Sequence, residues 1–411
     1  MKIIHFADVH LGMENYGKFD PETGLNSRLG DFLKSFDTIV QTAKNQKVDL
    51  VVFSGDAYKT REPSPTYQRA FASRIYEIAS SNIPVVLLVG NHDFPGALGK
   101  AHTLDIYPTL KVENIYLVSD EVRTIKTKSG PVQVAGLPWY TKQQLLSKDE
   151  LKLSLEKMHR ILSKKLAEKV DYLSSKINPK IPSILVVHAS VEGATFGSER
   201  SVMIGSDIVL PLAALRHSRF NYVALGHLHK FQVLSNPSTG GPPIIYSGSI
   251  ERIDFGEEKE DKGFILIDIH FDNSRLRTRW KFIKTPARKF LTIRLKISDK
   301  DNSEAKIIQT IKKEDIKDAV VKVIIEIDEE KASEISESKI RQALSEANYI
   351  AGIITEVKSH DRVKVKNGFS DELSSLDTLG ILEKYLTSKK VTKSHQQLLI
   401  KTAEKLIEKL Q

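Results

Sequence analysis

The residues best suited to chemistry in this sequence stand directly after short apolar runs. Acidic, amide and imidazole side chains follow such runs at five places: Asp8 with His10, Asp56, Asn91 with His92, His188, and His227 with His229. In the Asp-x-His and His-x-His pairs the two side chains are two residues apart, so an extended chain points both to one side. Oxygen and nitrogen ligands without thiolates suit Mn, Fe, Zn and similar divalent ions.

Seven of these side chains are candidate metal ligands, which is more than one catalytic ion needs: Asp8, His10, Asp56, Asn91, His188, His227 and His229. They suit two ions that share a carboxylate, and such a pair, about 3.5–4 Å apart, clamps the attacking and leaving oxygens of a phosphoryl displacement. Taken singly, each has a simpler explanation. A strand-end histidine is often only a satisfied polar residue, and Gly55-Asp56 could be a turn or a helix cap. Their joint placement favours a two-metal phosphoesterase site.

The elements that must position these side chains alternate between strands and helices. Apolar runs predict buried strands at residues 2–7, 48–53, 84–89, 184–187 and 222–225. Helices are expected from Leu29 onward and around Phe71, and this alternation is typical of a layered α/β fold. Further strands are expected at 112–118, 132–135, 244–246 and 264–269. The charged segment 147–177 predicts a long helix, whose apolar stripe we interpret as core packing and not as a cofactor site.

The composition changes after Thr285-Pro286. Apolar and polar residues alternate in 291–297 and 321–327, and a further strand is expected at 349–357. Helical segments at 304–311 and 338–347 would complete a small α+β domain. The sequence therefore predicts a first domain over 1–285, a second over 286–358, a polar linker over 359–370 and a charged helical segment over 371–411. We expect the leucines of that last segment to dock on a partner's coiled coil.

The totals place limits on the class of protein. The chain has 411 residues, of which 40% are hydrophobic and 27% charged, as expected for a globular protein of two or three domains. A net charge of +9 favours a polyanionic partner, although a generally basic composition explains it equally well. The absence of cysteine excludes disulfides and thiolate metal sites. No signal peptide and no apolar run of ~18 residues is present, so we expect a cytoplasmic protein without membrane contact.

The five motifs together carry a resemblance. Asp8-x-His10, Gly55-Asp56, Gly90-Asn91-His92-Asp93, His188 and Gly226-His227-x-His229 match, in order, the motif set of the calcineurin-like metallophosphoesterases. Within that superfamily the whole chain resembles the SbcD-type DNA-repair nucleases, relatives of the eukaryotic meiotic-recombination nuclease. The closer similarity lies in Arg61-Glu62-Pro63-Ser64-Pro65 and in residues 248–255. The resemblance implies a layered α/β fold: a metallophosphoesterase β-sandwich flanked by helices, with a small α+β DNA-capping domain and a helical C-terminal tail.

The resemblance also implies roles for individual residues. One metal ion would be held by Asp8, His10, Asp56 and His229, and a second by Asp56, Asn91, His188 and His227. Two Mn²⁺ are the usual choice of the family, with Mg²⁺ as an alternative. His92 would stabilise the transition state or protonate the leaving oxygen, and Asp93 would orient it. Lys59, Arg61 and Arg252 are expected to contact the substrate. Many relatives have a histidine, associated with exonuclease activity, where this chain has Lys59, so the balance of exonuclease to endonuclease activity stays open.

The implied activity is that of a manganese-dependent DNA nuclease, a 3′–5′ exonuclease, an endonuclease or both, acting at duplex ends and at hairpin or single-stranded regions. The implied partners are an SbcC-type ATPase and a second copy of the chain, on the nucleoid. The helices through Phe36 and Phe71 would form the homodimer, or would simply pack on the sheet. One alternative is another two-metal phosphodiesterase or a phosphatase on the same scaffold. Phosphatases of this superfamily carry Gly-Asp-x-x-Asp-Arg-Gly, whereas residues 55–61 are Gly-Asp-Ala-Tyr-Lys-Thr-Arg. A non-cutting DNA or ATPase tether is less favoured, because such scaffolds usually lose metal ligands.

Two charged stretches allow simple explanations. Arg275, Arg277, Arg279 and Lys281 alternate with mostly apolar residues, as in a strand with one basic face. That face could follow a phosphate backbone, but a solvated strand face is slightly favoured. The acidic run 257–261 predicts a solvated loop.

Overall fold

The computed structural model describes residues 1–95, 99–197, 207–216, 218–236, 241–273, 275–298, 302–358 and 393–408, with Leu379, Leu382, Leu386 and Thr387. Its contacts divide the chain into two compact units. The first comprises Met1–Leu295, Glu304–Ile325 and Ser336–Ile354, and the second comprises Lys296–Ser303, Glu326–Ile335 and Thr355–Gln411. The predicted boundaries at residues 285, 358 and 370 stay predictions, and the predicted linker 359–370 lies outside the described residues.

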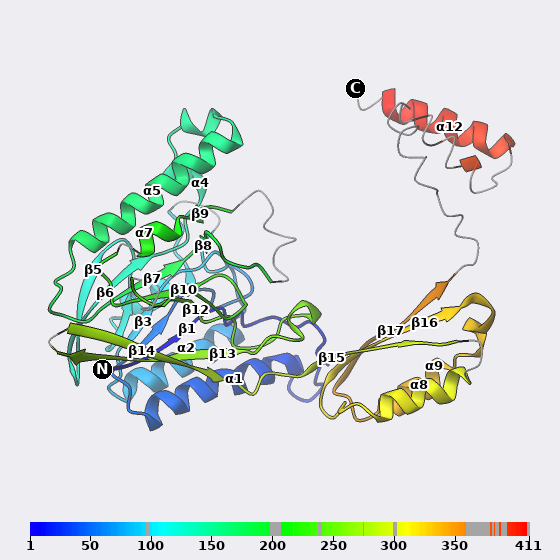
Figure 1. Cartoon of the computed structure of the whole chain (residues 1–411), viewed down its shortest axis with the longest axis horizontal. Coiled ribbons are helices and arrows are strands. Elements are labelled where there is room, and N and C mark those ends of the chain that lie inside the picture. The colour runs from blue at the N-terminus through cyan, green and yellow to red at the C-terminus, as the bar shows by residue number, and fades with distance from the viewer. Residues whose placement is uncertain are drawn as a thin grey trace. The chain divides into compact units, whose positions relative to one another are not determined.

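Two six-stranded sheets form the body of the first unit (Figure 1). In the first sheet β1 (Lys2–Phe6), β2 (Leu50–Phe53), β3 (Val85–Leu87) and β4 (Ile115–Leu117) are parallel, and β13 (Gly263–Asp272) and β14 (Arg275–Lys284) extend it antiparallel. In the second sheet β6 (Gly130–Leu137), β7 (Ser183–His188), β10 (Tyr222–Gly226) and β12 (Ile244–Tyr246) are parallel. Antiparallel β5 (Val122–Thr127) and β11 (Gln232–Ser235) form its edges.

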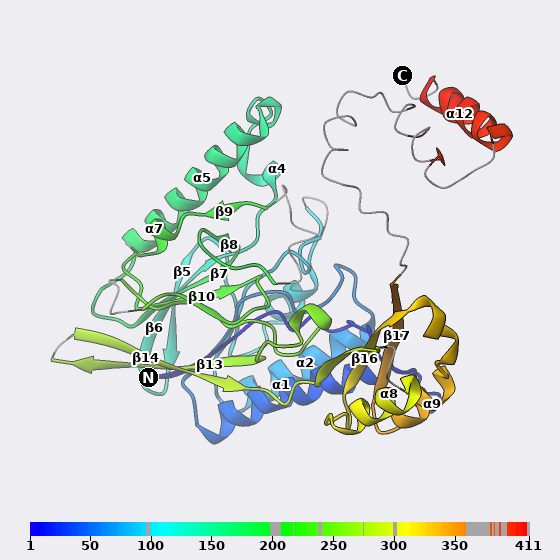
Figure 2. The same ribbon diagram turned by 45° about the vertical axis from the view of Figure 1, so that its right-hand side comes forward.

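The two sheets pack face to face and carry helices on their outer faces. Apolar side chains of both sheets, such as Val52 and Val186, form the core between them. Helices α1 (Ser27–Asn45) and α2 (Pro65–Ser80) cover the first sheet, and α5 (Leu155–Ser175) covers the second (Figures 1 and 2). The central strands are buried on both faces, which explains their continuous apolar runs. The predicted layered α/β sandwich flanked by helices is confirmed.

The aromatic residues of α1 and α2 pack on the first sheet. The Phe36 ring lies 5.4 Å from that of Phe6, and the Phe71 ring lies 5.3 Å from that of Phe53, measured between centroids. Both Phe36 and Phe71 are fully buried. Packing on the sheet is therefore confirmed for these two side chains, and a homodimer would have to use other residues of the helices.

The helix predicted over 147–177 is shorter than expected. Ser147 and Glu150 exchange backbone-to-side-chain hydrogen bonds of 2.7 and 3.2 Å, which close a separate turn before α5 begins at Leu155. The predicted stripe of α5 is core packing, since Leu162, Leu166 and Val170 are buried against the second sheet.

The C-terminal strands and helices occur in the predicted order. They are β15 (Phe290–Lys296), α8 (Ser303–Lys312), β16 (Val320–Asp328), α9 (Glu337–Ala343) and β17 (Tyr349–Lys358), with the strands in the order β15-β16-β17. In the predicted helical tail, α12 (Lys393–Glu408) leaves Leu398 61% exposed and Leu399 42% exposed. Across the described parts of the chain, no helix combines the length and apolar character needed to cross a membrane.

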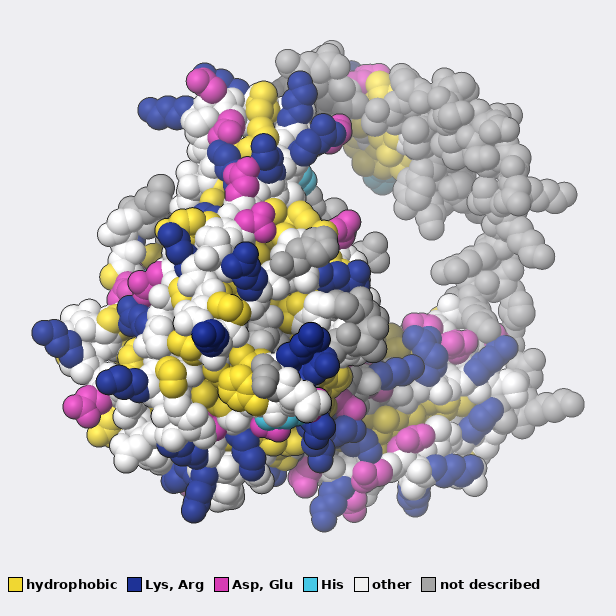
Figure 3. Space-filling view, turned by 60° about the vertical axis from the view of Figure 1, so that its left-hand side comes forward, with side chains coloured by type: hydrophobic (Ala, Val, Ile, Leu, Met, Phe, Trp, Pro, Cys, Tyr) yellow, Lys and Arg dark blue, Asp and Glu magenta, His cyan; other side chains and the backbone are white. Residues whose placement is uncertain are grey.

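The basic residues of β14 form a solvated strand face. Arg275, Arg277, Arg279 and Lys281 are exposed, whereas Leu276, Trp280 and Phe282 pack against the core between the sheets. In the space-filling view, basic side chains are interspersed with acidic and apolar ones (Figure 3). This arrangement agrees with the simpler of the two sequence interpretations.

Candidate metal centre

The five strand-end motifs converge from both sheets onto one place. Strands β1, β2 and β3 deliver the motifs that begin at Asp8, Asp56 and Asn91, and β7 and β10 deliver His188 and the His227 motif. Their side-chain atoms form three groups whose members lie within 4.8 Å of one another: Asp8, His10 and His229; His10, Asp56 and His92; and Asp56, His188 and His227. The structure therefore brings the predicted ligands together, although they come from two sheets and not from one sheet edge.

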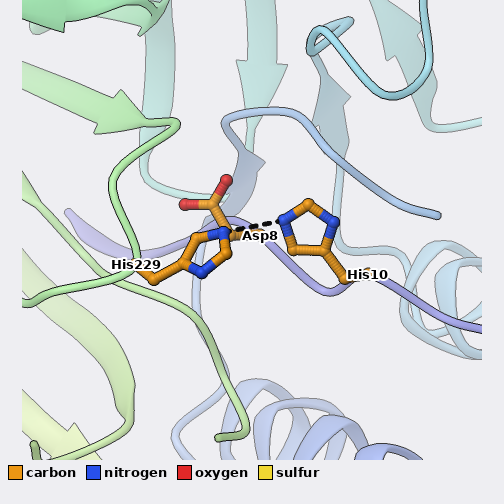
Figure 4. Close-up of side chains that lie close together, drawn as sticks. All are labelled: Asp8, His10 and His229. Atoms are coloured by element: carbon orange, nitrogen blue, oxygen red, sulfur yellow. Dashed lines mark hydrogen bonds between the residues drawn. The ribbon is translucent and has the colours of Figure 1, made fainter. Parts of the chain in front are cut away.

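In the first group two imidazole nitrogens face each other. His10 Nε2 lies 3.0 Å from His229 Nε2, and the Asp8 carboxylate lies beside them (Figure 4). Two nitrogen ligands bound to one ion at ~2.0–2.1 Å and a right angle would lie about 3 Å apart. The spacing and the mixture of one carboxylate and two imidazoles fit a divalent cation.

In the second group each imidazole faces an oxygen acceptor on both sides. Asn91 Oδ1 lies 2.9 Å from His188 Nε2 and 3.0 Å from His227 Nδ1. The opposite nitrogens lie 2.7 Å from the Ser54 carbonyl oxygen and 3.1 Å from Asp207 Oδ2, respectively. A neutral imidazole has only one N–H. A cation held by the two inner nitrogens and the Asn91 oxygen would resolve this conflict.

Asp56 lies between these two groups. Its Oδ2 is 3.4 Å from His188 Nε2 and 3.7 Å from His10 Nε2. The carboxylate is buried, and its Oδ1 accepts a hydrogen bond of 2.9 Å from the backbone N–H of His92. Asp56 is therefore placed where a carboxylate shared by two ions has to be.

The backbone at several candidate ligands is in the left-handed region. The φ angles are 52° at Asp8, 46° at His10, 63° at Asp56 and 102° at His227. Such conformations are uncommon outside glycine, and where they cluster they indicate a functional site. The close packing also explains Gly90, because a Cβ there would lie 2.1 Å from Asp56 Oδ1.

Asp93 supports the turn that carries Asp56. Its carboxylate accepts hydrogen bonds from the backbone N–H groups of Asp56 and Ala57 at 2.9 Å and of Gly90 at 3.1 Å. The His92 ring instead has its Nδ1 2.7 Å from the carbonyl oxygen of Lys59. The expectation that Asp93 orients His92 is therefore wrong: the Lys59 backbone does so.

Burial and mutual charge shift the pKa values of the clustered groups. Burial alone would raise the pKa of Asp56, but His188 and His10 hold it well below its usual range. Burial alone would lower the pKa of His188, but the charges of Asp56 and Asp8 raise it to about 9. Burial and the neighbouring Asp56 charge raise the pKa of Asp93 to about 7. The carboxylates are thus compensated by positive charge, which is what a bound cation would supply.

Two carboxylates at this site were missed in the sequence. Glu257 is fully buried, with Oε1 2.9 Å from His229 Nδ1, so the prediction of a solvated loop at 257–261 is wrong for this residue. Asp207 contacts His227, as described above. The Trp139 ring lies 4.9 Å from that of His227. None of the three ends a predicted strand in the way the ligand motifs do, and we find no sequence signal that distinguishes them.

The predicted substrate contacts have different surroundings. Lys59 and Arg61 are exposed. The Arg252 guanidinium donates to backbone carbonyls, at 3.2 Å to Glu257, 2.7 Å to Glu260 and 3.0 Å to Arg288. Its Nε and both terminal nitrogens are committed to the chain, which argues against the predicted substrate contact of Arg252.

Comparison with known proteins agrees with this geometry. The family model of the calcineurin-like phosphoesterases matches residues 1–231, more than half of the chain. The chain is 28% identical to the SbcD component of the nuclease SbcCD from Staphylococcus epidermidis over 315 residues, covering 74% of this chain and 77% of that protein. It is 26% identical to "DNA double-strand break repair protein Mre11" of Archaeoglobus fulgidus over 394 residues, covering 87% and 76%. The protein of the same name from Methanocaldococcus jannaschii is 26% identical over 316 residues, covering 76% and 74%.

Proposed function

The chain belongs to the calcineurin-like phosphoesterase family, and from this we propose that it is a metal-dependent DNA nuclease that hydrolyses phosphodiester bonds at DNA ends. The observation that carries the proposal is the pair of ligand groups on either side of the Asp56 carboxylate. The choice of DNA as substrate is supported by the names of the relatives, a nuclease component and double-strand break repair proteins.

In this proposal Asp8, His10, Asp56 and His229 hold one ion, and Asp56, Asn91, His188 and His227 hold the other. The oxygen and nitrogen ligands suit Mn²⁺, with Mg²⁺ as an alternative. When bound, the two ions supply a nucleophile at neutral pH and stabilise charge on the phosphate. The chain holds their ligands in place, and Asp93 contributes by fixing the turn that carries Asp56.

His92 is assigned to proton transfer. Its ring is half-buried beside His10, with 4.9 Å between the ring centroids. Donation of Nδ1–H to the Lys59 carbonyl orients the ring and leaves Nε2 to pass a proton to the leaving oxygen. The exposed side chains of Lys59 and Arg61 are the remaining candidates for phosphate contact.

The proposal includes a complex. One relative is named as part of the nuclease SbcCD, and we assign the helical tail, with exposed Leu398 and Leu399 on α12, to an SbcC-type ATPase. We further propose that residues 286–358 cap the DNA, that two copies of the chain pair through α1 and α2, and that the complex acts on the nucleoid. The 3′–5′ exonuclease and endonuclease activities are both retained as expectations.

The test is cleavage of end-labelled linear duplex and hairpin DNA with Mn²⁺, with Mg²⁺ or with chelator. We expect Mn²⁺-dependent cleavage that is lost in Asp56→Asn and falls about 10²–10⁴-fold in His92→Ala. The matched control is His270→Ala, which alters a histidine on β13 outside the metal centre and should cut like the wild type. Absence of cutting even with the ATPase and ATP would contradict the proposal, and hydrolysis of a phosphomonoester without DNA cleavage would support the phosphatase alternative.

A further inference from the structure

Each ligand group has a carboxylate behind it that is not a ligand in the scheme above. We propose that Glu257 and Asp207 are positioning residues: they fix the tautomers of His229 and His227, so that His229 offers Nε2 to one ion and His227 offers Nδ1 to the other. The proposal rests on the two-metal site proposed above.

Glu257 determines which nitrogen of His229 carries the proton. Its Oε1 lies 2.9 Å from His229 Nδ1, and its Oε2 accepts from Lys262 Nζ at 2.9 Å and from the Ile253 N–H at 2.9 Å. Glu257 and Lys262 are both buried. An ionised carboxylate only accepts hydrogen bonds, so His229 must carry its proton on Nδ1. The lone pair is then on Nε2, the nitrogen that faces His10.

Asp207 does the same for His227 with the opposite result. Its Oδ2 lies 3.1 Å from His227 Nε2 and also accepts a hydrogen bond from the Ser190 hydroxyl. The Asp207 side chain is only 8% exposed. His227 therefore carries its proton on Nε2, and its lone pair is on Nδ1, which faces Asn91. Two histidines that are two residues apart in the chain thus present different nitrogens to the site.

This arrangement has a measurable consequence. A carboxylate that accepts the outer N–H of a metal-bound histidine holds the ring and makes the inner nitrogen more basic. Loss of such a partner weakens metal binding by about 10–100-fold. Because each ligand group has its own carboxylate, the two losses should fall on different ions. General damage to the fold would weaken both ions together.

The experiment is a Mn²⁺ titration of the metal-free protein, with free Mn²⁺ followed by electron paramagnetic resonance. The wild type should bind two ions. Asp207→Asn should weaken one of them by about 10–100-fold and Glu257→Gln the other, and the double variant should weaken both. The matched control is Asp268→Asn, which removes a carboxylate that lies 3.4 Å from His270 Nδ1 outside the metal centre, and it should bind like the wild type.

A second readout does not depend on metal. In ¹⁵N spectra of histidine-labelled, metal-free protein, His227 should carry its proton on Nε2 and His229 on Nδ1, and each assignment should be lost only in its own variant. Ser190→Ala removes the hydroxyl that supports Asp207 and should weaken the same ion to a smaller extent, so it replaces Asp207→Asn if that variant does not fold.

The outcomes separate the inference from the function on which it rests. If the wild type binds fewer than two ions, both fail. If it binds two ions and the variants bind them equally well, or if each variant weakens both ions alike, the positioning role is overturned while the metal centre stands.

Discussion

Lys262 provides the sharpest test of how the metal centre is supported. Its ammonium is 2% exposed and donates to Glu257 Oε2 at 2.9 Å, to Glu260 Oε2 at 2.9 Å and to the His229 carbonyl oxygen at 3.0 Å. Lys262→Met keeps much of the volume and removes the charge. The variant would leave the buried Glu257 carboxylate with only its His229 and Ile253 donors.

The magnitude follows from the burial of this ion pair. Removing one partner of a buried pair costs about 3–5 kcal/mol. The pKa of Glu257 gives a similar figure: burial alone would raise it, but Lys262 and the His229 hydrogen bond lower it from 4.5 to about 2, which corresponds to about 3 kcal/mol. Because the folded pKa is lowered, this stability is fully present above pH 4.5 and is lost as the pH falls towards 2.

The assay is thermal unfolding at pH 7 with chelator present, so that metal binding does not contribute. An unfolding entropy of ~2.1 cal/mol/K per residue over the predicted first domain makes 3–5 kcal/mol a fall in Tm of roughly 5–8 °C. The control is Lys284→Met. Its Nζ lies 2.7 Å from Asp261 Oδ2, but the two side chains are 66% and 56% exposed. A surface pair contributes about 0–1 kcal/mol, so its Tm should fall by less than about 2 °C. Equal shifts in the two variants would refute the reasoning.

Three further changes test other parts of the structure. Gly90→Ala places a Cβ 2.1 Å from Asp56 Oδ1 and should abolish Mn²⁺ uptake in the titration, whereas Gly30→Ala, on α1 with open space around it, should leave uptake unchanged and raise stability by about 0.5–1 kcal/mol. His5 is fully buried, and its burial lowers its pKa from 6.5 to about 3. The unfolded chain therefore binds a proton between pH 6.5 and 3 that the folded chain does not. Stability should fall by about 1.4 kcal/mol per pH unit more in the wild type than in His5→Gln, measured by urea unfolding. Arg252→Lys cannot reach the same backbone carbonyls, so it should lower the Tm and leave KM for DNA unchanged.

Each of these expectations has an opposing result. Normal Mn²⁺ uptake by Gly90→Ala would mean that Asp56 does not need its observed position. Parallel pH profiles of the wild type and His5→Gln would mean that the buried ring is not neutral. A raised KM with an unchanged Tm in Arg252→Lys would restore the substrate contact that the sequence suggested.

The parts of the fold that sequence predicts best are those buried on both faces. The parallel strands β1, β2 and β3 are continuous apolar runs because no face of them meets water. The edge strand β5 was not predicted. Its sequence, Val-Arg-Thr-Ile-Lys-Thr, buries only one residue, so the alternation carries little information. The start of α5 was misplaced because a local exchange of hydrogen bonds at Ser147, and not the apolar pattern, ends the preceding segment.

The candidate ligands were predictable for a related reason. A parallel strand delivers the residue after it to the sheet edge, so position in the chain determines position in space for Asp8, Asp56 and His188. Asp207 and Glu257 reach the site from segments with no periodic pattern, and their contacts depend on how loops fold over one another. The same holds for Arg252, whose charge suggested a phosphate contact and whose donors in fact bind the backbone.

The left-handed residues of the metal centre make a final point about how the site is maintained. Such conformations at Asp8, His10, Asp56 and His227 cost of order 1–3 kcal/mol each, which together is comparable with the ~5–15 kcal/mol that stabilises a whole domain. Contacts independent of metal must offset this cost. The described structure contains them: Asp93 accepts three backbone N–H groups, and the Asp8 carboxylate accepts the His227 N–H at 3.0 Å. The loops are therefore ordered by the chain itself. Metal binding does not have to order them, and its affinity should depend mainly on the ligands and on the carboxylates behind them.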